Sequence, residues 1–315
     1  MKKAVKIITS VLVVILAAII AFCGYLAFRI YANAPKTQNG YNEIYLQNEI
    51  TLDVDSDGKF RVLKINDTHF FNGTCDNDVR TLDELKTVLD KTPCNLIIAN
   101  GDLVDGFNLN KEYDKYQAIS EFAGLVKSYD IPWTFAPGNN DGEIDGDIEN
   151  VIAYMMQYDH FVCGNDKNTD GAMQFFIDLT DSGELVHSIA ILDSGSRTPK
   201  ITGSYDYIKG SQINWLLDGI EERQVNTSVF FHMPTPQFQK AYNNGEVYNG
   251  FMMYNTYPYD DIEKNKLFDE MTANNEYISL ISCGHQHSNN MCTFYDERYY
   301  QLSSVSGYSA SMTSL

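Results

Sequence analysis

The sequence predicts an α/β fold in which helices alternate with the strands of a mixed sheet. Short apolar runs, typical of buried strands, alternate with stretches in which apolar residues recur at helical spacing. The chain has 315 residues, of which 44% are hydrophobic and 13% aromatic, so it can bury a substantial core. Neither a low-complexity run nor a repeat at a fixed period interrupts this pattern.

The elements follow in order along the chain. The first half predicts a β-α-β-α-β unit, with strands at residues 60–65, 95–99 and 132–136 and helices over 79–89 and 119–126. The second half predicts strands at 173–179 and 188–192, a helix over 213–220, and strands at 228–231 and 277–282. This alternation is what an open α/β sheet requires.

The N-terminal segment predicts a membrane anchor. Residues 7–28 carry no charge and are long enough to cross a hydrocarbon core of about 30 Å. Lys2, Lys3 and Lys6 precede the run, so residues 1–6 are expected in the cytoplasm and the main domain outside it. We interpret 7–28 as a single-pass signal anchor in the cell membrane, 29–55 as a tether and 56–315 as the domain. A cleaved signal peptide, with secretion of the domain, is the alternative.

The predicted domain is strongly acidic. The chain has a net charge of −19, and without the basic Lys2, Lys3, Lys6 and Arg29 the remainder holds 19 basic and 42 acidic residues, or −23. Such a surface repels nucleic-acid backbones, so nucleic acid is an unlikely partner. Five cysteines lie beyond the anchor without zinc-ribbon spacing, and one or two disulfides would be permitted outside the cytoplasm. The pairing stays open.

Side chains of metal-ligand type follow five of the predicted strands. Ligands of open α/β sheets bind at the carboxyl ends of strands, so these groups are expected to converge on one site. Any single group could equally be a turn or a hydrogen-bonded histidine, but four of the six histidines in the chain belong to this pattern. The predicted metal ligands are Asp67, His69, Asp102, Asn139, His232, His285 and His287.

In this order the motifs resemble those of the calcineurin-like metallophosphoesterases over roughly residues 60–290, and are most similar to the branch related to purple acid phosphatases. The resemblance implies a four-layered sandwich of two mixed β-sheets flanked by helices, with two metal ions. Each ion would be held by four side chains, with Asp102 common to both. The resemblance implies that one ion is held by Asp67, His69, Asp102 and His287. It implies that the other is held by Asp102, Asn139, His232 and His285.

Two such cations would acidify a water that attacks phosphorus and would draw off charge from the phosphoryl oxygens. The expected metals are Mn, Zn, Fe or a mixed pair, and the ligands do not choose among them because they mix oxygen and imidazole nitrogen. Where purple enzymes place a tyrosine three residues after the bridging Asp, this chain has Asp105, so no tyrosinate-to-iron colour is expected.

A second departure concerns proton transfer. In the family the third motif usually carries a histidine where this chain has Asn140, and an amide cannot act as a general acid near neutral pH. We therefore predict slow hydrolysis of esters with poor leaving groups, unless Asp141 or His160 replaces the missing acid. Asn140 and Asp141 are the predicted catalytic positions.

The resulting hypothesis is a membrane-anchored phosphomonoesterase or phosphodiesterase that acts on a phosphorylated small molecule or phosphoprotein. A weak or inactive pseudo-phosphatase that binds a phosphorylated ligand or partner is the alternative. Five tyrosines at residues 242–259 are interpreted either as a loop that stacks on a ring of the substrate or as ordinary surface packing.

Overall fold

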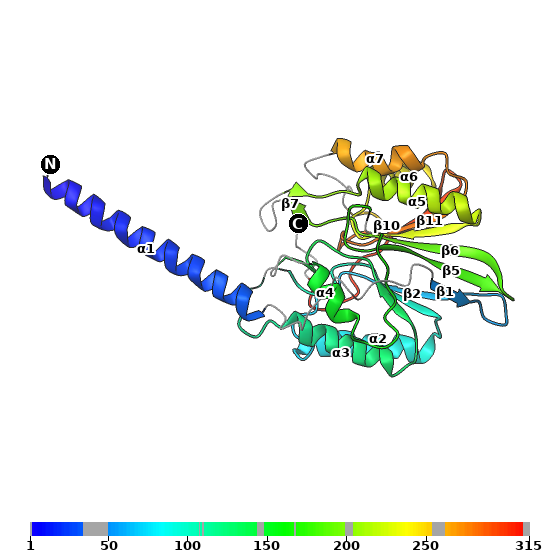
Figure 1. Cartoon of the computed structure of the whole chain (residues 1–315), viewed down its shortest axis with the longest axis horizontal. Coiled ribbons are helices and arrows are strands. Elements are labelled where there is room, and N and C mark those ends of the chain that lie inside the picture. The colour runs from blue at the N-terminus through cyan, green and yellow to red at the C-terminus, as the bar shows by residue number, and fades with distance from the viewer. Residues whose placement is uncertain are drawn as a thin grey trace. The chain divides into compact units, whose positions relative to one another are not determined.

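A computed structural model describes residues 2–33, 50–106, 108, 110–143, 148–166, 168–198, 204–253 and 262–310. The chain forms two compact units, Met1–Lys36 and Thr37–Leu315. The first consists of helix α1 (Lys2–Asn33), in which residues Ile8–Tyr25 are long and apolar enough to cross a membrane and have no buried side chain (Figure 1). A signal sequence near the N-terminus can meet the same criteria of length and composition.

The second unit contains a large mixed sheet of eight strands, in the order β1-β5-β6-β9-β11-β13-β12-β10. Its inner strands β6, β9, β11 and β13 run parallel to one another, whereas β5, β12 and β10 pair antiparallel with their inner neighbours. The strands are β1 (Ile50–Asp53), β5 (Gln174–Asp181), β6 (Glu184–Leu192), β9 (Thr227–Phe230), β10 (Glu246–Phe251), β11 (Ile278–Cys283), β12 (Asn290–Tyr295) and β13 (Arg298–Leu302).

A smaller sheet of three parallel strands packs against the large one. It consists of β2 (Val62–Ile65), β3 (Leu96–Ala99) and β4 (Trp133–Phe135). Helices α2 (Asp76–Lys91), α3 (Lys115–Lys127) and α4 (Ile148–Met155) lie on its outer side, and α5 (Gly210–Arg223), α6 (Pro236–Asn244) and α7 (Ile262–Thr272) lie on the outer side of the large sheet (Figure 1). The predicted four-layered α/β architecture is therefore confirmed. A short hairpin of β7 (Arg197–Thr198) and β8 (Ser204–Tyr205) lies outside both sheets.

Two apolar cores hold the layers together, because successive side chains of a strand point to opposite faces of the sheet. In β5, Phe175 and Ile177 face the core shared with the small sheet, whereas Phe176 packs with α5, α6 and α7. The small sheet is apolar on both faces, as expected for parallel strands between two layers. Its strand β4 contributes Trp133, the largest fully buried side chain among the described residues.

The predicted elements match the observed ones to within a few residues, with one correction. Strand β1 lies inside residues 29–55, which the sequence analysis assigned to a tether, and it pairs in parallel with β5. A four-residue edge strand carries too little apolar pattern to be recognised. Residues 34–49 of the predicted tether lie outside the described residues. The six cysteines are free, so the disulfides that the sequence permits are not formed.

One partly buried carboxyl group of the helical layer makes stability depend on pH. Asp269 of α7 accepts hydrogen bonds from the Thr235 hydroxyl at 2.5 Å and the Gln237 backbone N–H at 2.9 Å. Burial nevertheless raises the pKa of Asp269 to about 7, against these bonds and the charges of Lys240 and Arg298. The folded state then binds a proton more tightly than the unfolded state does.

We expect Asp269 to make unfolding easier as pH rises from about 4 to about 7, by on the order of 4 kcal/mol in the free energy of unfolding. The stabilisation from protonated Asp269 is fully present below the pKa of Asp269 in the unfolded state. It is lost as the pH rises to the pKa in the folded state and does not change further above it. Asp269→Asn should remove this slope, which urea unfolding of both proteins at about pH 5 and pH 7.5 would measure. Parallel pH profiles for the two proteins would contradict the assignment.

Candidate metal centre

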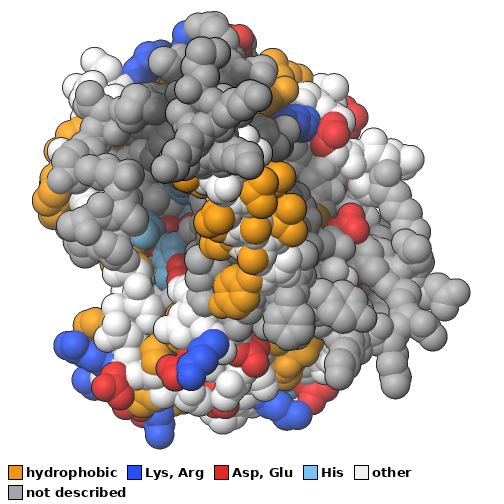
Figure 2. All heavy atoms as spheres, turned by 90° about the vertical axis from the view of Figure 1, so that its left-hand side faces the viewer, with side chains coloured by type: hydrophobic (Ala, Val, Ile, Leu, Met, Phe, Trp, Pro, Cys, Tyr) orange, Lys and Arg blue, Asp and Glu red, His pale blue; other side chains and the backbone are white. Residues whose placement is uncertain are grey.

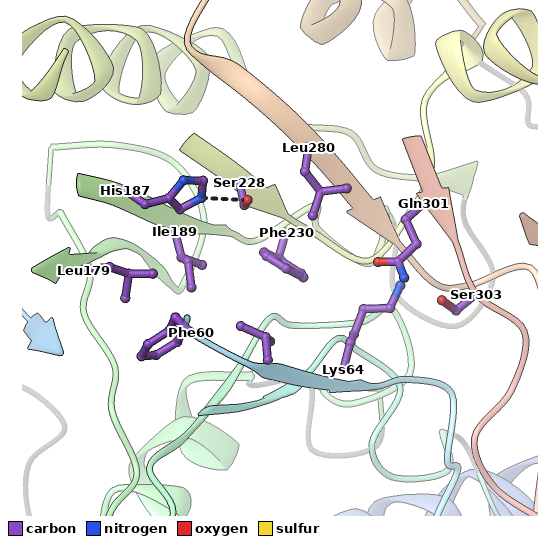
Figure 3. A pocket seen from close by; sticks show the side chains of 11 residues that line it. Phe60, Lys64, Leu179, His187, Ile189, Ser228, Phe230, Leu280, Gln301 and Ser303 are labelled. Carbon is purple, nitrogen blue, oxygen red and sulfur yellow. Dashed lines mark hydrogen bonds between the residues drawn. The ribbon is translucent and has the colours of Figure 1, made fainter. Parts of the chain in front are cut away.

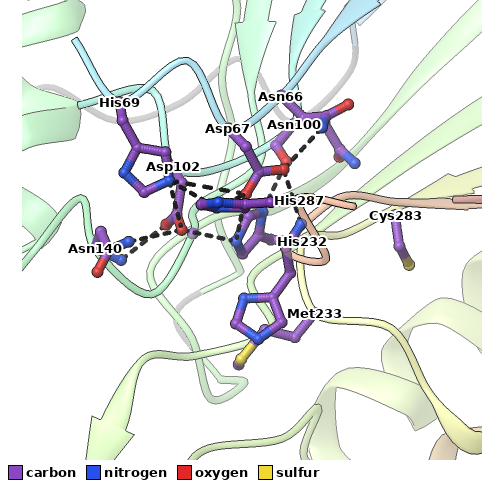
Figure 4. A network of polar contacts seen from close by, with 12 residues as sticks. Asn66, Asp67, His69, Asn100, Asp102, Asn140, His232, Met233, Cys283 and His287 are labelled. Carbon is purple, nitrogen blue, oxygen red and sulfur yellow. Dashed lines mark hydrogen bonds and ion pairs between the residues drawn. The ribbon is translucent and has the colours of Figure 1, made fainter. Parts of the chain in front are cut away.

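The carboxyl ends of five strands bring the predicted ligands together between the two sheets. Asp67 and His69 follow β2, Asp102 follows β3 and Asn139 follows β4, so the small sheet supplies the oxygen ligands and one imidazole. The large sheet supplies three histidines, His232 after β9 and His285 and His287 after β11. Figure 4 shows five of these side chains directed toward one another, namely Asp67, His69, Asp102, His232 and His287. Figure 2 shows histidine and acidic side chains together in a recess of the surface.

The side chains form two groups, each of which could hold a metal ion. Asp67, His69 and His287 offer ligand atoms within 4.8 Å of one another, and so do Asp102, His232 and His285. The two groups adjoin, because Asp102 Oδ2 lies 3.2 Å from His232 Nε2 and 3.7 Å from His69 Nε2. Asp102 is thus within reach of both groups.

The first group contains two imidazole nitrogens in direct contact. His69 Nε2 and His287 Nε2 lie 3.1 Å apart. If both nitrogens carried protons they would repel, whereas a cation about 2.0–2.1 Å from each would account for their approach. Asp67 Oδ1 lies 3.4 Å from His287 Nε2 and completes this group.

Asp67 is held so that one oxygen remains free. Its Oδ2 accepts hydrogen bonds from the Asn66 side-chain amide at 2.7 Å and the His285 backbone N–H at 2.8 Å. Its Oδ1 is buried, makes no hydrogen bond, and faces His287 and His232. A buried oxygen without a partner is costly, and a cation in the site would remove that cost.

The second group also contains a buried ligand atom that makes no hydrogen bond. His232 Nδ1 lies 3.0 Å from the backbone carbonyl of Asn100, which fixes that nitrogen as the donor and leaves Nε2 with a lone pair. His232 Nε2 and Asn139 Oδ1 are buried and make no hydrogen bond. Atoms without hydrogen bonds from the two groups, Asp67 Oδ1 and His232 Nε2, lie 3.9 Å apart, and the mixture of oxygen and imidazole nitrogen at the site suits Mn, Zn or Fe.

Electrostatic shifts at the site reflect crowded charges that have been taken out of water. Burial lowers the pKa of His232, but the charges of Asp102 and Asp67 outweigh it and raise that pKa to about 10, so a cation that binds Nε2 would displace a proton from it. Burial and the positive charge of His232 lower the pKa of His285 to about 3. Burial raises the pKa of Asp67, yet the charge of His232 holds it below its usual range. The cluster thus gathers positive charge around its carboxylates.

The backbone around the site is shaped by left-handed residues and by glycine. Asp67, His69, Asp102 and His285 have φ angles between 48° and 69°, a region that few residues other than glycine adopt. Gly101 has a φ of +86°, and a Cβ atom there would lie 2.2 Å from His232 Nδ1. The strand ends turn sharply here, which aims successive side chains at the same point.

The two predicted catalytic residues have different surroundings. Asn140 donates from its side-chain amide to Asp102 Oδ2 and from its backbone N–H to Asp102 Oδ1, both at 2.8 Å. Asp141 is fully buried, and its carboxylate accepts backbone N–H groups of Asp102, Val104 and Gly138 at 2.8–3.2 Å. This geometry favours a positioning role for Asp141 and argues against the expectation that it replaces the missing acid.

His160, the other expected substitute, lies away from the site. Its imidazole is 3.1 Å from Asp130, and its backbone carbonyl accepts the N–H of Trp133, the first residue of β4. Asn139 follows the last residue of β4, so His160 lies at the opposite end of the strand. The expectation that it supplies a proton at the metal centre is therefore wrong.

Residues that support the ligands were not all predicted. Asn66 orients Asp67, and the carbonyl of Asn100 orients His232. Each stands one or two residues from a predicted ligand or its motif, and this proximity was the only signal in the sequence. Asp105, noted above only for the missing tyrosine, has its Oδ1 3.5 Å from His69 Nδ1, the nitrogen that points away from His287.

The structure describes two of the five tyrosines at residues 242–259, and they have different surroundings. Tyr242 lies in α6 and packs against the outer core, and Tyr248 lies exposed in β10. The remaining members Tyr254, Tyr257 and Tyr259 lie outside the described residues.

Comparisons with known proteins agree with this geometry. The family model described as calcineurin-like phosphoesterase matches residues 60–289. Phosphatase DCR2 of Saccharomyces cerevisiae is 24% identical over 76% of this chain, although the chain spans only about half (46%) of that protein. "Probable inactive purple acid phosphatase 14" of Arabidopsis thaliana is 25% identical over 76% of this chain and 69% of its own length.

Among solved structures, a dimetal phosphatase from Danio rerio superposes with a TM-score of 0.55 at 11% identity, over 78% of this chain and 88% of its own. At that identity the likeness concerns the fold.

Proposed function

Because the chain belongs to the calcineurin-like phosphoesterase family, we propose that it is a metal-dependent phosphoester hydrolase. The observation that carries the proposal is that Asp67 Oδ1 and His232 Nε2, two buried atoms without hydrogen bonds, lie 3.9 Å apart at the strand ends, where Asn139 Oδ1 is likewise buried without a hydrogen bond. These atoms are free to bind cations. The rest of the site holds them in place through hydrogen bonds on their other atoms.

Two ions would be held by overlapping sets of side chains. Asp67, His69 and His287 would bind one ion, Asn139, His232 and His285 would bind the other, and Asp102 would bridge them. When bound, the ions would supply an acidified water as nucleophile and would neutralise charge on the phosphoryl oxygens.

The surrounding residues keep the ligands in this arrangement. Asn66 directs Asp67, and the Asn100 carbonyl keeps the Nε2 lone pair of His232 free. Asp141 fixes the turn that carries Asp102, through the backbone N–H groups of Asp102 and Gly138. Burial of these groups excludes water that would otherwise compete for the ligand atoms.

The substrate class is a phosphomonoester or phosphodiester of a small molecule or protein. The net charge of −23 outside the N-terminal segment repels polyanions, so attraction of the substrate would depend on the bound cations rather than on the surface. We further propose that α1 anchors the chain in a membrane, with the catalytic domain outside the cytoplasm; secretion after cleavage is the alternative.

A pseudo-phosphatase that binds metals and a phosphorylated partner is the second candidate. It is favoured by Asn140, whose amide contacts Asp102 where an acid would serve the leaving group. A plant relative is itself named probably inactive. The two candidates share the metal centre and differ only in turnover.

Hydrolysis assays separate these candidates. Nitrophenyl phosphate and bis-nitrophenyl phosphate should be hydrolysed by the protein loaded with Mn, Zn or Fe, and His285→Ala should abolish the activity. Bound metal without hydrolysis of either ester would support the binding protein. Less than one metal per chain would contradict both.

Asn140→His tests the missing proton donor. We expect it to increase turnover of an alkyl phosphate by at least about tenfold and that of nitrophenyl phosphate far less, because only the alkyl leaving group needs a proton. Steady-state rates of both proteins on both esters measure the ratio. Asn140→Gln retains an amide and serves as the control. Equal changes on the two substrates would contradict a role in leaving-group protonation.

A further inference from the structure

A second cavity lies between the two sheets, apart from the metal centre. It has a volume of about 350 Å³, within the range of small-molecule sites. One wall is β2, and the other is formed by β6, β9, β11 and β13 of the large sheet (Figure 3). Its middle is apolar, with Val62, Ile189, Phe230 and Leu280 facing the space. None of the seven predicted metal ligands lines it.

One end of the cavity carries the ammonium group of Lys64. Lys64 Nζ donates to the Ser282 hydroxyl at 3.0 Å and the Cys283 carbonyl at 2.8 Å, which leaves one of its three protons unused. Burial lowers the pKa of Lys64 to about 8, so the amine is still mostly protonated at physiological pH. Among the described residues Lys64 forms no ion pair within 4 Å, and the charge of Asp67 acts on it only from farther away. Gln301 and Ser303 stand beside Lys64 and add polar groups to this end (Figure 3).

The opposite end carries no charge. His187 Nε2 lies 2.9 Å from the Ser228 hydroxyl, and burial lowers the pKa of His187, so its ring is neutral at physiological pH. Phe60 and Leu179 close this end (Figure 3). Lys64 lies in β2 and Phe60 precedes that strand by two residues, so four residues of chain at about 3.3 Å each, roughly 13 Å, separate the two ends of the cavity. Phe60, Lys64 and His187 are half-buried, and the space is therefore connected to solvent.

We propose that this cavity binds an amphiphilic monocarboxylate of the medium-chain fatty-acid class. The carboxylate would pair with Lys64 and accept hydrogen bonds from Gln301 and Ser303. The hydrocarbon chain would lie along Val62, Phe230 and Leu280 toward His187. The shape of the cavity, its apolar middle and its single cationic end select an unbranched chain with one anionic head.

Isothermal titration of the full chain in lipid nanodiscs tests the proposal with octanoate, butyrate and octanol as probes. Octanoate should bind, and butyrate should bind at least about 50-fold more weakly, because each buried methylene group strengthens binding by roughly fourfold. Octanol should bind at least about tenfold more weakly than octanoate, because it lacks the charge. Failure of octanoate to bind up to about 10 mM, or equal binding of octanol, would overturn the proposal.

Two lysine variants identify the anion contact. Lys64→Met keeps the length of the side chain but removes its charge, and should weaken octanoate at least about tenfold while leaving octanol unchanged. Lys127→Met, which alters an exposed lysine on α3, is the matched control and should bind octanoate as the unchanged protein does. The probes also partition into the nanodisc lipid, but to the same extent for each protein, so differences between the variants report binding to the protein. Undiminished binding of octanoate by folded Lys64→Met would contradict the assignment of Lys64 as the anion contact. If that variant does not fold, the binding of octanoate, butyrate and octanol to the unchanged protein still tests the proposal.

Discussion

Asp102→Asn is expected to hydrolyse nitrophenyl phosphate at least about a thousandfold more slowly than the unchanged protein, a loss of about 4 kcal/mol of transition-state stabilisation. The substitution replaces a carboxylate, with two oxygens and a full negative charge, by an amide with one acceptor oxygen. Asp102 Oδ2 lies 3.2 Å from His232 Nε2 and 3.7 Å from His69 Nε2, so it is within reach of both groups of ligand atoms. Its loss should weaken binding of both ions.

The measurement needs a control for general effects of removing one negative charge. Asp218→Asn changes an exposed carboxylate of α5 and should retain full activity. Metal content, measured after dialysis, should fall in Asp102→Asn and stay constant in Asp218→Asn. Retained activity in folded Asp102→Asn would remove the proposed bridging role.

Removal of metal ions is expected to lower the melting temperature by more than about 5 °C. The ligands come from both sheets, with Asp67, His69, Asp102 and Asn139 on one side and the three histidines on the other. Ions would therefore link the two layers, and a site saturated a hundredfold above its Kd contributes about 2.7 kcal/mol to the free energy of unfolding. In a domain of this size each kcal/mol corresponds to about 2–4 °C.

Differential scanning calorimetry before and after chelation, followed by return of Mn or Zn, measures this contribution. The return of metal should restore the transition. Asp102→Asn should show a smaller change on chelation than the unchanged protein, because it holds less metal at the start. An identical melting temperature with and without chelator would show that the two layers do not depend on the ions.

The site was predictable because the strand ends are visible in the sequence. NLIIA before Gly101 and Asp102, for example, is a short apolar run that stops at a glycine and a ligand, and the structure ends β3 at Ala99. Local pattern therefore fixed which side chains lie at the carboxyl ends. The same pattern could not assign β2 and β9 to different sheets, since pairing depends on contacts between distant residues.

Residues that act through hydrogen bonds were the hardest to predict. Asp141 stands in a ligand-rich motif, so its type and position favoured a role in proton transfer. Only the coordinates reveal that three backbone N–H groups surround its carboxylate. Lys64 is the reverse case, because a single lysine in an apolar strand gives no sign of a cavity that forms between two sheets.

The left-handed backbone at the metal centre restricts which residues evolution or an engineer can place there. At Asp67, Asp102 and His285, with φ angles of 49–69°, asparagine and glycine fit the backbone, whereas valine and isoleucine would clash with it. Variants with asparagine or glycine at one of these positions would thus fold but bind less metal. Variants with a β-branched residue there would be unstable. Loss of chemistry and loss of fold can in this way be separated at a single residue.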